Sequence, residues 1–208
     1  MVPLHIVDLP ISLATDTLCL PWDIVEAIES HKEQTTTAPS PSPSFAVSQL
    51  KGWARSSSGH EWHDLGVHEE LRAGCLVQTS PGPDGYLDIS LRRSVTVRVY
   101  PGSLVAITDV TRGHDGVGDG VGDGAALALR VGKIRVEAEQ ASTCEVALTN
   151  GIVRISGGLA CLYDRGDVDA LGGSALVTLK GQSEPSKVPQ GYRFDATSGK
   201  LYELPNVH

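Results

Sequence analysis

The sequence predicts an all-β fold, an antiparallel sandwich or roll of many short strands, preceded by a short irregular or helical N-terminal segment and a Ser/Pro linker. Composition gives the first indication, because only 5% of the 208 residues are aromatic while 23 glycines separate short runs rich in Val and Leu. Such runs favour short strands joined by tight turns. Apolar and polar residues also alternate along these runs, and beyond residue 45 no segment of useful length has the 3.6-residue period of a helix.

The chain divides into three zones. Residues 1–30 form a short, largely apolar segment, in which Pro21–Ser30 favours one or two helical turns, and they are too few to bury a core of their own. Residues 31–44 are rich in Thr, Ser and Pro, a composition that predicts an extended, solvated linker. Residues 45–206 carry the β domain, which is long enough for one well-buried core.

Alternation of apolar and polar residues predicts the individual strands. In Tyr86–Leu91 the apolar side chains at alternate positions face one way, while Asp88 and Ser90 face the other. This pattern is typical of antiparallel sheets with one buried and one wet face. The predicted strands are Val47–Ala54, Gly74–Thr79, Tyr86–Leu91, Val95–Val99, Leu104–Val110, Ala125–Arg130, Lys133–Ala138, Thr143–Leu148, Ile152–Ile155, Leu159–Tyr163, Ala175–Leu179 and Lys200–Leu204.

Glycine-containing turn signals separate the predicted strands. Asn150-Gly151, between two apolar runs, is the strongest hairpin signal in the chain. The segment Asp164–Gly173 is typical of a hairpin loop, so we expect its Arg-Gly-Asp tripeptide to be an ordinary loop sequence and not an adhesion motif. The other turn signals are Pro83-Asp84-Gly85, Val131-Gly132-Lys133 and Gly172-Gly173.

Charge and hydropathy indicate which partners and which cellular locations are expected. The formal net charge of −8 and the lack of a basic run argue against a nucleic-acid partner, because phosphate-binding faces need clustered Lys and Arg. No stretch approaches the roughly 20 apolar residues that span a bilayer. The N-terminus lacks the pattern of a secretory leader. We therefore expect either a cytoplasmic protein or a natural precursor that begins before Met1.

The four cysteines, Cys19, Cys75, Cys144 and Cys161, form no CxxC pair and match no zinc-binding spacing. Cys144 and Cys161 can form a disulfide in an oxidising compartment where their strands are neighbours. Buried free thiols are the alternative, because cysteine packs as a small hydrophobic residue. The sequence leaves both possibilities open.

Residues 65–103 resemble the FecR domain. A leading Leu comes first, followed after a gap by "L..G..V.T"; an alternating apolar strand follows, and "V.V.P.S" closes the stretch. Similar elements at 129–136, which resembles a hairpin of the family, at 150–158 and at 177–181 extend the resemblance to about residues 47–195. The positions that carry the first three elements are Leu71, Gly74, Val77 and Thr79, then Leu87, Ile89 and Leu91, then Val95, Val97, Pro101 and Ser103.

The FecR resemblance implies an extracytoplasmic, mostly antiparallel β domain. The best-known members of this family are membrane-spanning regulators that pass a periplasmic signal to a sigma factor. The 208 residues include neither the transmembrane helix nor the helical anti-sigma region of those regulators. We therefore expect a stand-alone FecR-like binding module.

Residues 7–23 resemble the end of YceK-like small lipoproteins, which close on "DLPlSl..DTl.LPyD". Asp8-Leu9-Pro10 opens the matching stretch and Leu20-Pro21-Trp22-Asp23 ends it. Such lipoproteins carry their signal and lipidated cysteine upstream of this point, so Cys19 is not the lipidation site. The resemblance implies a precursor that begins before Met1, in which a lipoprotein segment is joined to the β domain by the linker.

Two segments carry residue types that bind metals. His60, His63 and His68 lie near several carboxylates, but their spacing is not HExxH, and on a strand His60 and His63 point to opposite faces. We expect them to be surface histidines. In Gly113–Gly124, Asp residues recur every four positions, as oxygen ligands of calcium can. The distal Glu of an EF-hand is lacking, so we interpret this segment as a flexible insertion, and whether it binds calcium stays open.

These observations predict a non-enzymatic, extracytoplasmic FecR-like binding or signalling-accessory module at the bacterial cell envelope, with a protein or glycan partner. We assign no catalytic, cofactor-binding or metal-binding residue and no cofactor. Trp53 and Trp62 can stack on a sugar where exposed, although we expect them to pack against the sheet. A structural assembly protein and a cryptic carbohydrate-active hydrolase are the alternatives. An exposed aromatic patch on a rigid sheet favours binding, and a deep cleft with two carboxylates favours the hydrolase.

Overall fold

A computed structural model describes residues 45–91, 94–108 and 124–205, and these residues form strands and connecting turns. The all-β prediction is therefore confirmed. The predicted segment 1–30 and linker 31–44 lie outside the described residues. The strands are β1 Phe45–Lys51, β2 Ala54–Ser57, β3 Trp62–Asp64, β4 Glu70–Leu71, β5 Leu76–Thr79, β6 Tyr86–Leu91, β7 Val95–Val99, β8 Leu104–Thr108, β9 Gly124–Val131, β10 Lys133–Leu148, β11 Gly151–Tyr163, β12 Val168–Leu179, β13 Ser186–Pro189, β14 Tyr192–Asp195 and β15 Lys200–Glu203.

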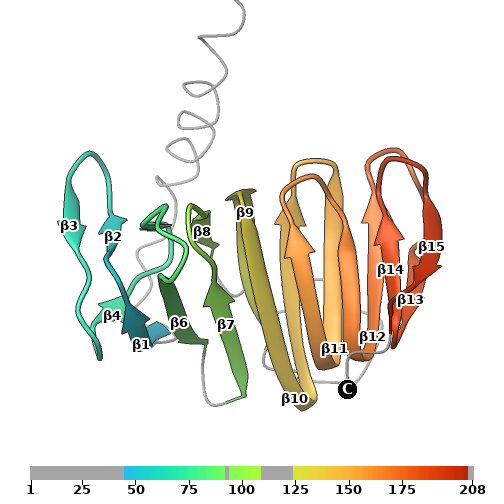
Figure 1. Cartoon of the computed structure of the whole chain (residues 1–208), viewed down its shortest axis with the longest axis horizontal. Coiled ribbons are helices and arrows are strands. Elements are labelled where there is room, and N and C mark those ends of the chain that lie inside the picture. The colour runs from blue at the N-terminus through green and yellow to red at the C-terminus, as the bar shows by residue number, and fades with distance from the viewer. Residues whose placement is uncertain (1–44, 92–93, 109–123, 206–208) are drawn as a thin grey trace, which may run out of the picture. The chain divides into compact units, whose positions relative to one another are not determined.

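Three long strands connect the rest of the sheet. β10, β11 and β12 lie side by side, antiparallel along their lengths (Figure 1). Their halves have different neighbours, because β10 pairs first with β7 and then with β9, whereas β12 pairs first with β14 and then with β13. The strands therefore form two layers that share β10, β11 and β12. The first layer also contains β4, β1, β6, β7, β14 and β15, and the second contains β3, β2, β5, β8, β9 and β13.

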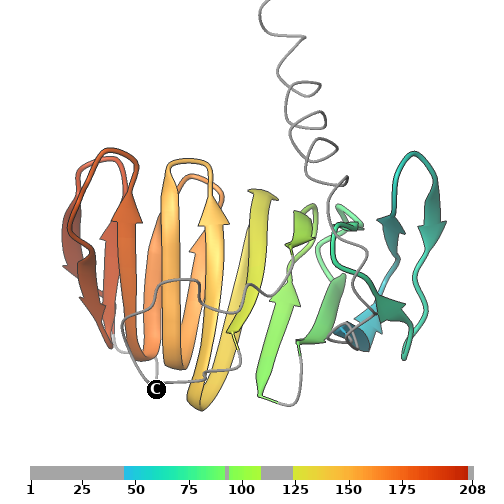
Figure 2. The same ribbon diagram turned by 180° about the vertical axis from the view of Figure 1, so that it is seen from behind.

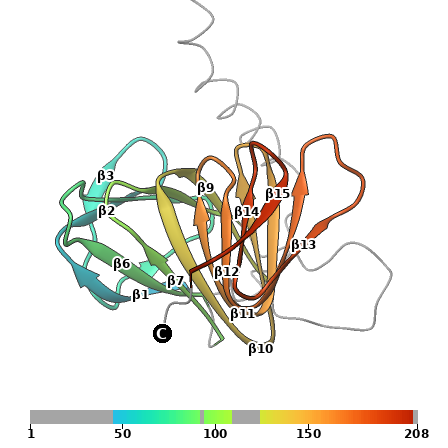
Figure 3. The same ribbon diagram turned by 45° about the vertical axis from the view of Figure 1, so that its right-hand side comes forward.

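The long strands change layer at glycine-rich irregularities. Register shifts interrupt the β10–β11 and β11–β12 ladders where the strands change layer. Figure 3 shows the three long strands next to one another. Gly157 and Gly173 have φ angles of 56° and 68°, a region that glycine enters without steric cost. A Cβ atom on Gly158 would lie 2.4 Å from the carbonyl oxygen of Gly172. Glycine thus permits both the bend and the close approach of β11 to β12.

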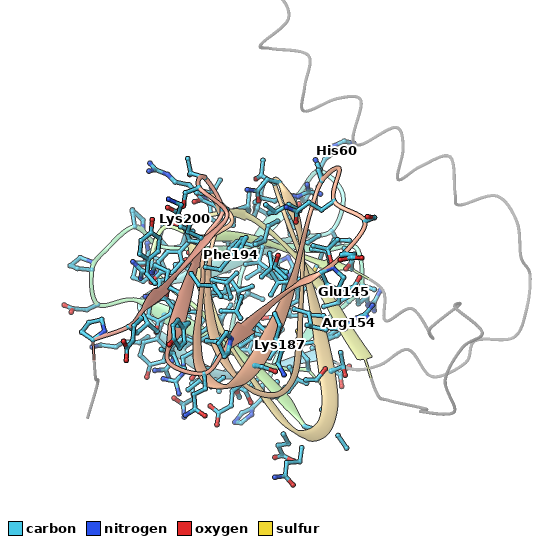
Figure 4. The ribbon with its side chains drawn as sticks, turned by 90° about the vertical axis from the view of Figure 1, so that its right-hand side faces the viewer. His60, Glu145, Arg154, Lys187, Phe194 and Lys200 are labelled. Carbon is cyan, nitrogen blue, oxygen red and sulfur yellow. The ribbon has the colours of Figure 1, made fainter. Side chains whose placement is uncertain are left out.

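One hydrophobic core fills the space between the layers. Val97, Ile134 and Phe194 of the first layer belong to the same buried cluster as Val77 and Ile155 of the second. These side chains occupy the alternate, inward positions of their strands, as period-two patterning requires. In Figure 4, Phe194 lies among the ribbons while Glu145 and Arg154 lie at the outer side. The predicted sandwich or roll is the observed architecture.

The strand predictions are most accurate where alternation is regular. Tyr86–Leu91 and Val95–Val99 have the observed bounds, and β6 and β7 lie next to each other in both front and back views (Figure 2). The predicted pairs of short strands at 133–148 and 152–163 are instead the single long strands β10 and β11, because their bulges interrupt the alternation. The predicted strand Val47–Ala54 is divided into β1 and β2 at Gly52, whose φ is 82°. The sequence prediction omitted the short strands β3, β4, β13 and β14.

The predicted hairpin at Asn150-Gly151 is present, with a different role for glycine. Leu148 lies opposite Gly151, so Thr149 and Asn150 form the two-residue turn between β10 and β11. Gly151 is not among the described residues with positive φ. A Cβ atom there would lie 2.4 Å from the carbonyl oxygen of Thr178 on β12. Glycine is required here by close packing against a neighbouring strand.

Two turn predictions are wrong. Residues 129–136 do not form a hairpin, because Gly132 carries the chain from the second layer to the first. The far half of β10 then returns to the second layer and pairs in parallel with β9. Gly172 and Gly173 lie inside β12 at its bend, so the loop predicted for 164–173 ends at Asp167. Both errors have one cause, since a glycine that bends or transfers a strand has the same sequence signal as a glycine in a turn.

Candidate functional site

Two half-exposed tryptophans flank an arginine on the outer side of the second layer. The guanidinium carbon of Arg55 lies 4.7 Å from the ring centroid of Trp62 and 5.8 Å from that of Trp53. Trp53 is 48% exposed and Trp62 is 40% exposed. The expectation that both rings are covered by the sheet is therefore wrong. We call these three residues the Trp–Arg face.

The β2–β3 hairpin explains why these side chains meet. Trp53 and Arg55 are two positions apart along the chain, which places them on the same side of an extended backbone. Arg55 lies opposite Asp64, and Ser57 lies opposite Trp62. The Nε atom of Arg55 also donates a hydrogen bond of 2.9 Å to Oε1 of Gln78 on β5. The arginine is thus fixed between the two rings, on a hairpin at one end of the strand order.

The three histidines do not converge. His60 and His68 are exposed in turns on either side of β3, and of the three only His63 has partners among the described side chains. Its Nε2 atom lies 2.9 Å from both Ser56 Oγ and Glu69 Oε1. Across the described ranges, no group of three His, Cys, Asp or Glu side chains is placed to hold a metal ion.

The cluster of Ser56, His63 and Glu69 contains the residue types of a hydrolase triad but not its geometry. A triad uses one ring nitrogen of histidine for the serine and the other for the carboxylate. Here the same nitrogen contacts both groups. Ser56 is also only 2% exposed. The arrangement therefore offers no accessible nucleophile.

An open hollow of about 410 Å³ lies beside β14 and β15, with Arg193 and Tyr202 in its lining. Two of its carboxylates have local structural roles. Asp167 accepts a hydrogen bond from the Ala196 N–H, and Asp195 accepts from the Ser198 hydroxyl and the Thr197 N–H. These bonds, that from Ser198 above all, lower the pKa of Asp195. A general acid needs a raised pKa, so Asp195 is not suited to that role.

The three described cysteines are free and buried. Cys144 lies opposite Ile155, and Cys161 lies opposite Arg135. Ile155 and Cys161 lie on opposite sides of the bend in β11, on stretches that belong to different layers. This register excludes the disulfide left open by the sequence. Burial raises the pKa of the Cys144 thiol to about 12, so it is no candidate nucleophile.

Two other sequence motifs add no site. Arg165-Gly166-Asp167 forms the turn between β11 and β12. Gly166 is buried with a φ of 98°, and Asp167 is bonded to the backbone of the β14–β15 connection. The tripeptide therefore has a structural role. Residues 109–123, which include nearly all of the Asp/Gly segment 113–124, lie outside the described residues.

The residues missed by the sequence reasoning are Arg55 and Gln78. The predicted strand Val47–Ala54 contains Trp53 but ends before Arg55, so the sequence prediction did not place the two side chains together. The position of Trp62 beside them depends on the β2–β3 register, and that of Gln78 on the β2–β5 register. No local signal in the sequence gives either register.

Comparison with known proteins gives partial likenesses. Residues 1–24 match the family described as "protein of unknown function (DUF1375)". No curated protein matches the chain. Two solved structures, both described as "a putative anti-sigma factor" from Parabacteroides distasonis, match 62% of this chain at 12% and 11% identity, with TM-scores of 0.45 and 0.44. The chain spans 58% of the length of each. These likenesses are too partial to assign a family or an activity to the whole chain.

Proposed function

We propose that this chain is a non-enzymatic binding module that recognises a protein partner through the Trp–Arg face. The observation that carries the proposal is the pair of half-exposed tryptophans stacked on Arg55. Tryptophan and arginine are the residues most enriched among those that dominate binding energy at protein interfaces. In a chain with only 5% aromatic residues, this exposed patch is unusual.

The rigidity of the surface supports binding. Arg55 is held by Gln78 and by both rings, so little side-chain freedom is lost when a partner docks. β3 adds backbone groups at the same place, because it ends the order of the described strands and its three residues are exposed. A partner strand can pair there while its side chains contact Trp62.

We also propose that the chain does not catalyse a reaction. It is supported by the one-nitrogen contact of His63 with Ser56 and Glu69, and by the lowered pKa of Asp195 in the open hollow. It is supported too by the high pKa of the buried Cys144. None of these groups has the accessibility or pKa that acid–base or nucleophilic chemistry requires.

Photo-crosslinking in native cells tests the binding surface. Asp64, exposed on β3 and opposite Arg55, is replaced by p-benzoylphenylalanine, and Lys187, exposed on β13, carries the same probe as a control. We expect one discrete protein adduct from position 64 and none from position 187. Trp62→Ala and Trp53→Ala should each weaken the interaction by about 30-fold, as expected for residues that contribute at least about 2 kcal/mol.

The other outcomes are informative. An adduct with glycan, with no protein adduct, would replace the protein partner by the sugar-binding alternative. Adducts that persist in both tryptophan variants, or equal adducts from positions 64 and 187, would contradict the Trp–Arg face as the binding surface. Circular dichroism of each variant distinguishes lost binding from lost folding.

We infer that the module acts outside the cytoplasm, at the bacterial cell envelope, as an accessory to signalling. Support comes from the resemblance of residues 47–195 to FecR domains and of 7–23 to YceK-like lipoproteins. The resemblance to YceK-like lipoproteins makes a lipid the tether we propose. In the described part of the chain, no helix has the length and hydropathy to cross a bilayer. Fractionation of the native protein with intact-mass analysis of its N-terminus tests this. A lipidated or signal-cleaved form in the envelope is expected, and a cytoplasmic form starting at Met1 would contradict it.

A further inference from the structure

A second surface, on the outer side of the first layer, is built from tyrosines and cations. Its central row crosses six neighbouring strands, with residues from β6, β7, β10, β11, β12 and β14 opposite one another in register. In that order the residues are Asp88, Arg98, Arg135, Cys161, Asp169 and Arg193. Tyr100 and Lys133 adjoin this row, with the Tyr100 N–H bonded to the Lys133 carbonyl, and Tyr163 lies opposite Lys133.

The acidic members of the row lie beneath the basic ones. Asp88 and Asp169 each have side chains that are only 8% exposed, and each accepts two hydrogen bonds from one arginine. Those arginines, Arg98 and Arg193, are 36% and 44% exposed. The buried carboxylates thus hold the guanidinium groups in place, and the groups of the row that face solvent are cations.

Among the described residues of this surface, Lys133 and Arg135 are the cations that no buried carboxylate neutralises. The ammonium of Lys133 lies 4.7 Å from the ring centroid of Tyr100 and 5.0 Å from that of Tyr163. Among the described residues, no carboxylate lies within 4.0 Å of it. Of the described carboxylates, Arg135 contacts that of Glu137 alone, at 3.5 Å, and the Glu137 side chain is 62% exposed.

The chemistry around Lys133 keeps it charged. Burial opposes its charge, but the neighbouring Cys161 and Tyr163 outweigh burial and raise its pKa above its ordinary 10.5. The two rings also hold the ammonium in place by cation–π contact. Arg135 is the next residue on the same side of β10. Because the positive charge of Lys133 is already fixed in position, it can bind a carboxylate at low entropic cost.

We propose that this tyrosine–cation face binds an acidic, extended segment of a protein, anchored by Lys133 and Arg135. The row crosses six strands, so its length is about 24 Å at a strand spacing of about 4.8 Å, the span of roughly seven extended residues. Charge complementarity selects a segment with spaced Glu or Asp side chains. A nucleic acid is disfavoured because the chain has a net charge of −8 and Glu137 borders the anchor. The site lies on the opposite layer from the Trp–Arg face and does not depend on it.

Fluorescence anisotropy with a defined probe tests the proposal on the full chain. The probe is a fluorescein-labelled (Glu-Ser)5 peptide at low ionic strength, compared with (Gln-Ser)5. We expect saturable binding of the first peptide alone, weakened at least about fivefold by Lys133→Gln and by Arg135→Gln, and abolished by both together. Added salt should weaken it steadily. Lys187→Gln, which removes an exposed cation from β13 in the other layer, should leave it within about twofold.

Several results would overturn the proposal. These are no binding of (Glu-Ser)5, equal binding of (Gln-Ser)5, or an equal loss in Lys187→Gln and Lys133→Gln. Tighter binding of a labelled dT10 oligonucleotide would show a general polyanion surface in place of a peptide site. Trp62→Ala should not change peptide affinity, so failure of the Trp–Arg face and failure of this site are distinguishable. Unchanged thermal unfolding of each variant confirms that the fold is intact.

Discussion

At the residue scale, the ion pairs of the described chain fall into two kinds. Asp88 is almost fully buried and accepts two hydrogen bonds of 2.7 Å from Arg98. These bonds raise the pKa of Arg98. The pair Arg154–Glu145, at 3.0 Å, is instead exposed at both ends, to 57% and 41%. A carboxylate that loses its partner while buried suffers a desolvation cost, whereas an exposed one is solvated by water.

Arg98→Ala should therefore destabilise the fold more than Arg154→Ala. We expect a loss of about 2 kcal/mol in the free energy of unfolding for Arg98→Ala, below the range for fully buried pairs because Arg98 is 36% exposed. For Arg154→Ala the loss should be about 0.5 kcal/mol or less. Urea denaturation of both variants measures the difference.

A second substitution distinguishes the stability lost through an unpaired buried charge from the stability lost through poorer packing. Adding Asp88→Ala to Arg98→Ala should restore part of the stability, since no uncompensated carboxylate remains beneath the sheet surface. If the double variant is as unstable as the sum of the two single variants, the loss comes from packing of Arg98 on the Tyr86 ring, 4.3 Å away.

The candidate site shows how far residue-level reasoning reaches. Trp53 and Trp62 were identifiable from sequence as possible stacking residues, because aromatic side chains are rare in this chain. Their exposure was not predictable. It depends on Arg55, which occupies the space between the rings, and on β3, which lies at the end of the strand order with no further described strand beside it to cover Trp62.

At the element scale, glycine gives the long strands their shape. β11 and β12 approach most closely at the bend, where a Cβ atom on Gly158 would lie 2.4 Å from the Gly172 carbonyl oxygen. Real Cβ atoms do not approach backbone oxygen this closely, so any larger residue must separate the strands. The bend is also where the two layers of the sandwich part.

Gly158→Ala should destabilise the fold by about 2 kcal/mol, because backbone cannot move aside as a flexible side chain can. Gly82→Ala is the matched control. A Cβ atom on Gly82 would have no neighbour within 4 Å, and Gly82 is not among the residues with positive φ, so its change should be neutral or slightly stabilising. Thermal and urea unfolding measure both. Equal effects of the two substitutions would contradict the close-approach explanation.

Element boundaries were predictable only where local pattern and tertiary pairing agree. Tyr86–Leu91 alternates without interruption, and both of its edges are paired. β10 instead contains Ala141, a residue with a φ of 70°, and polar residues beside it that interrupt the alternation. The strand continues because β11 pairs with it on both sides of the irregularity. The omitted strand β3, which is exposed along its length, has no buried face to reveal it.

At the scale of the whole molecule, the buried cluster draws on the described residues from Phe45 to Phe194. We expect a chain beginning at Ser42 to fold by itself, with one cooperative unfolding transition and a free energy of unfolding within about 1 kcal/mol of the full chain. Denaturation followed by circular dichroism and by tryptophan fluorescence measures this. Non-coincident transitions, or loss of the transition in the shorter chain, would show that residues 1–41 are needed for stability.

The sequence by itself determined the fold class and which residues point into the core, because period-two alternation indicates which side of each strand is buried. It also determined the acidic balance and the rarity of aromatic residues on which the site argument depends. Only the tertiary structure decided that β10, β11 and β12 serve two layers, that Cys144 and Cys161 lie apart, and that Arg55 meets two tryptophans. Each of these depends on strand register, and register is set by contacts between residues far apart in the chain.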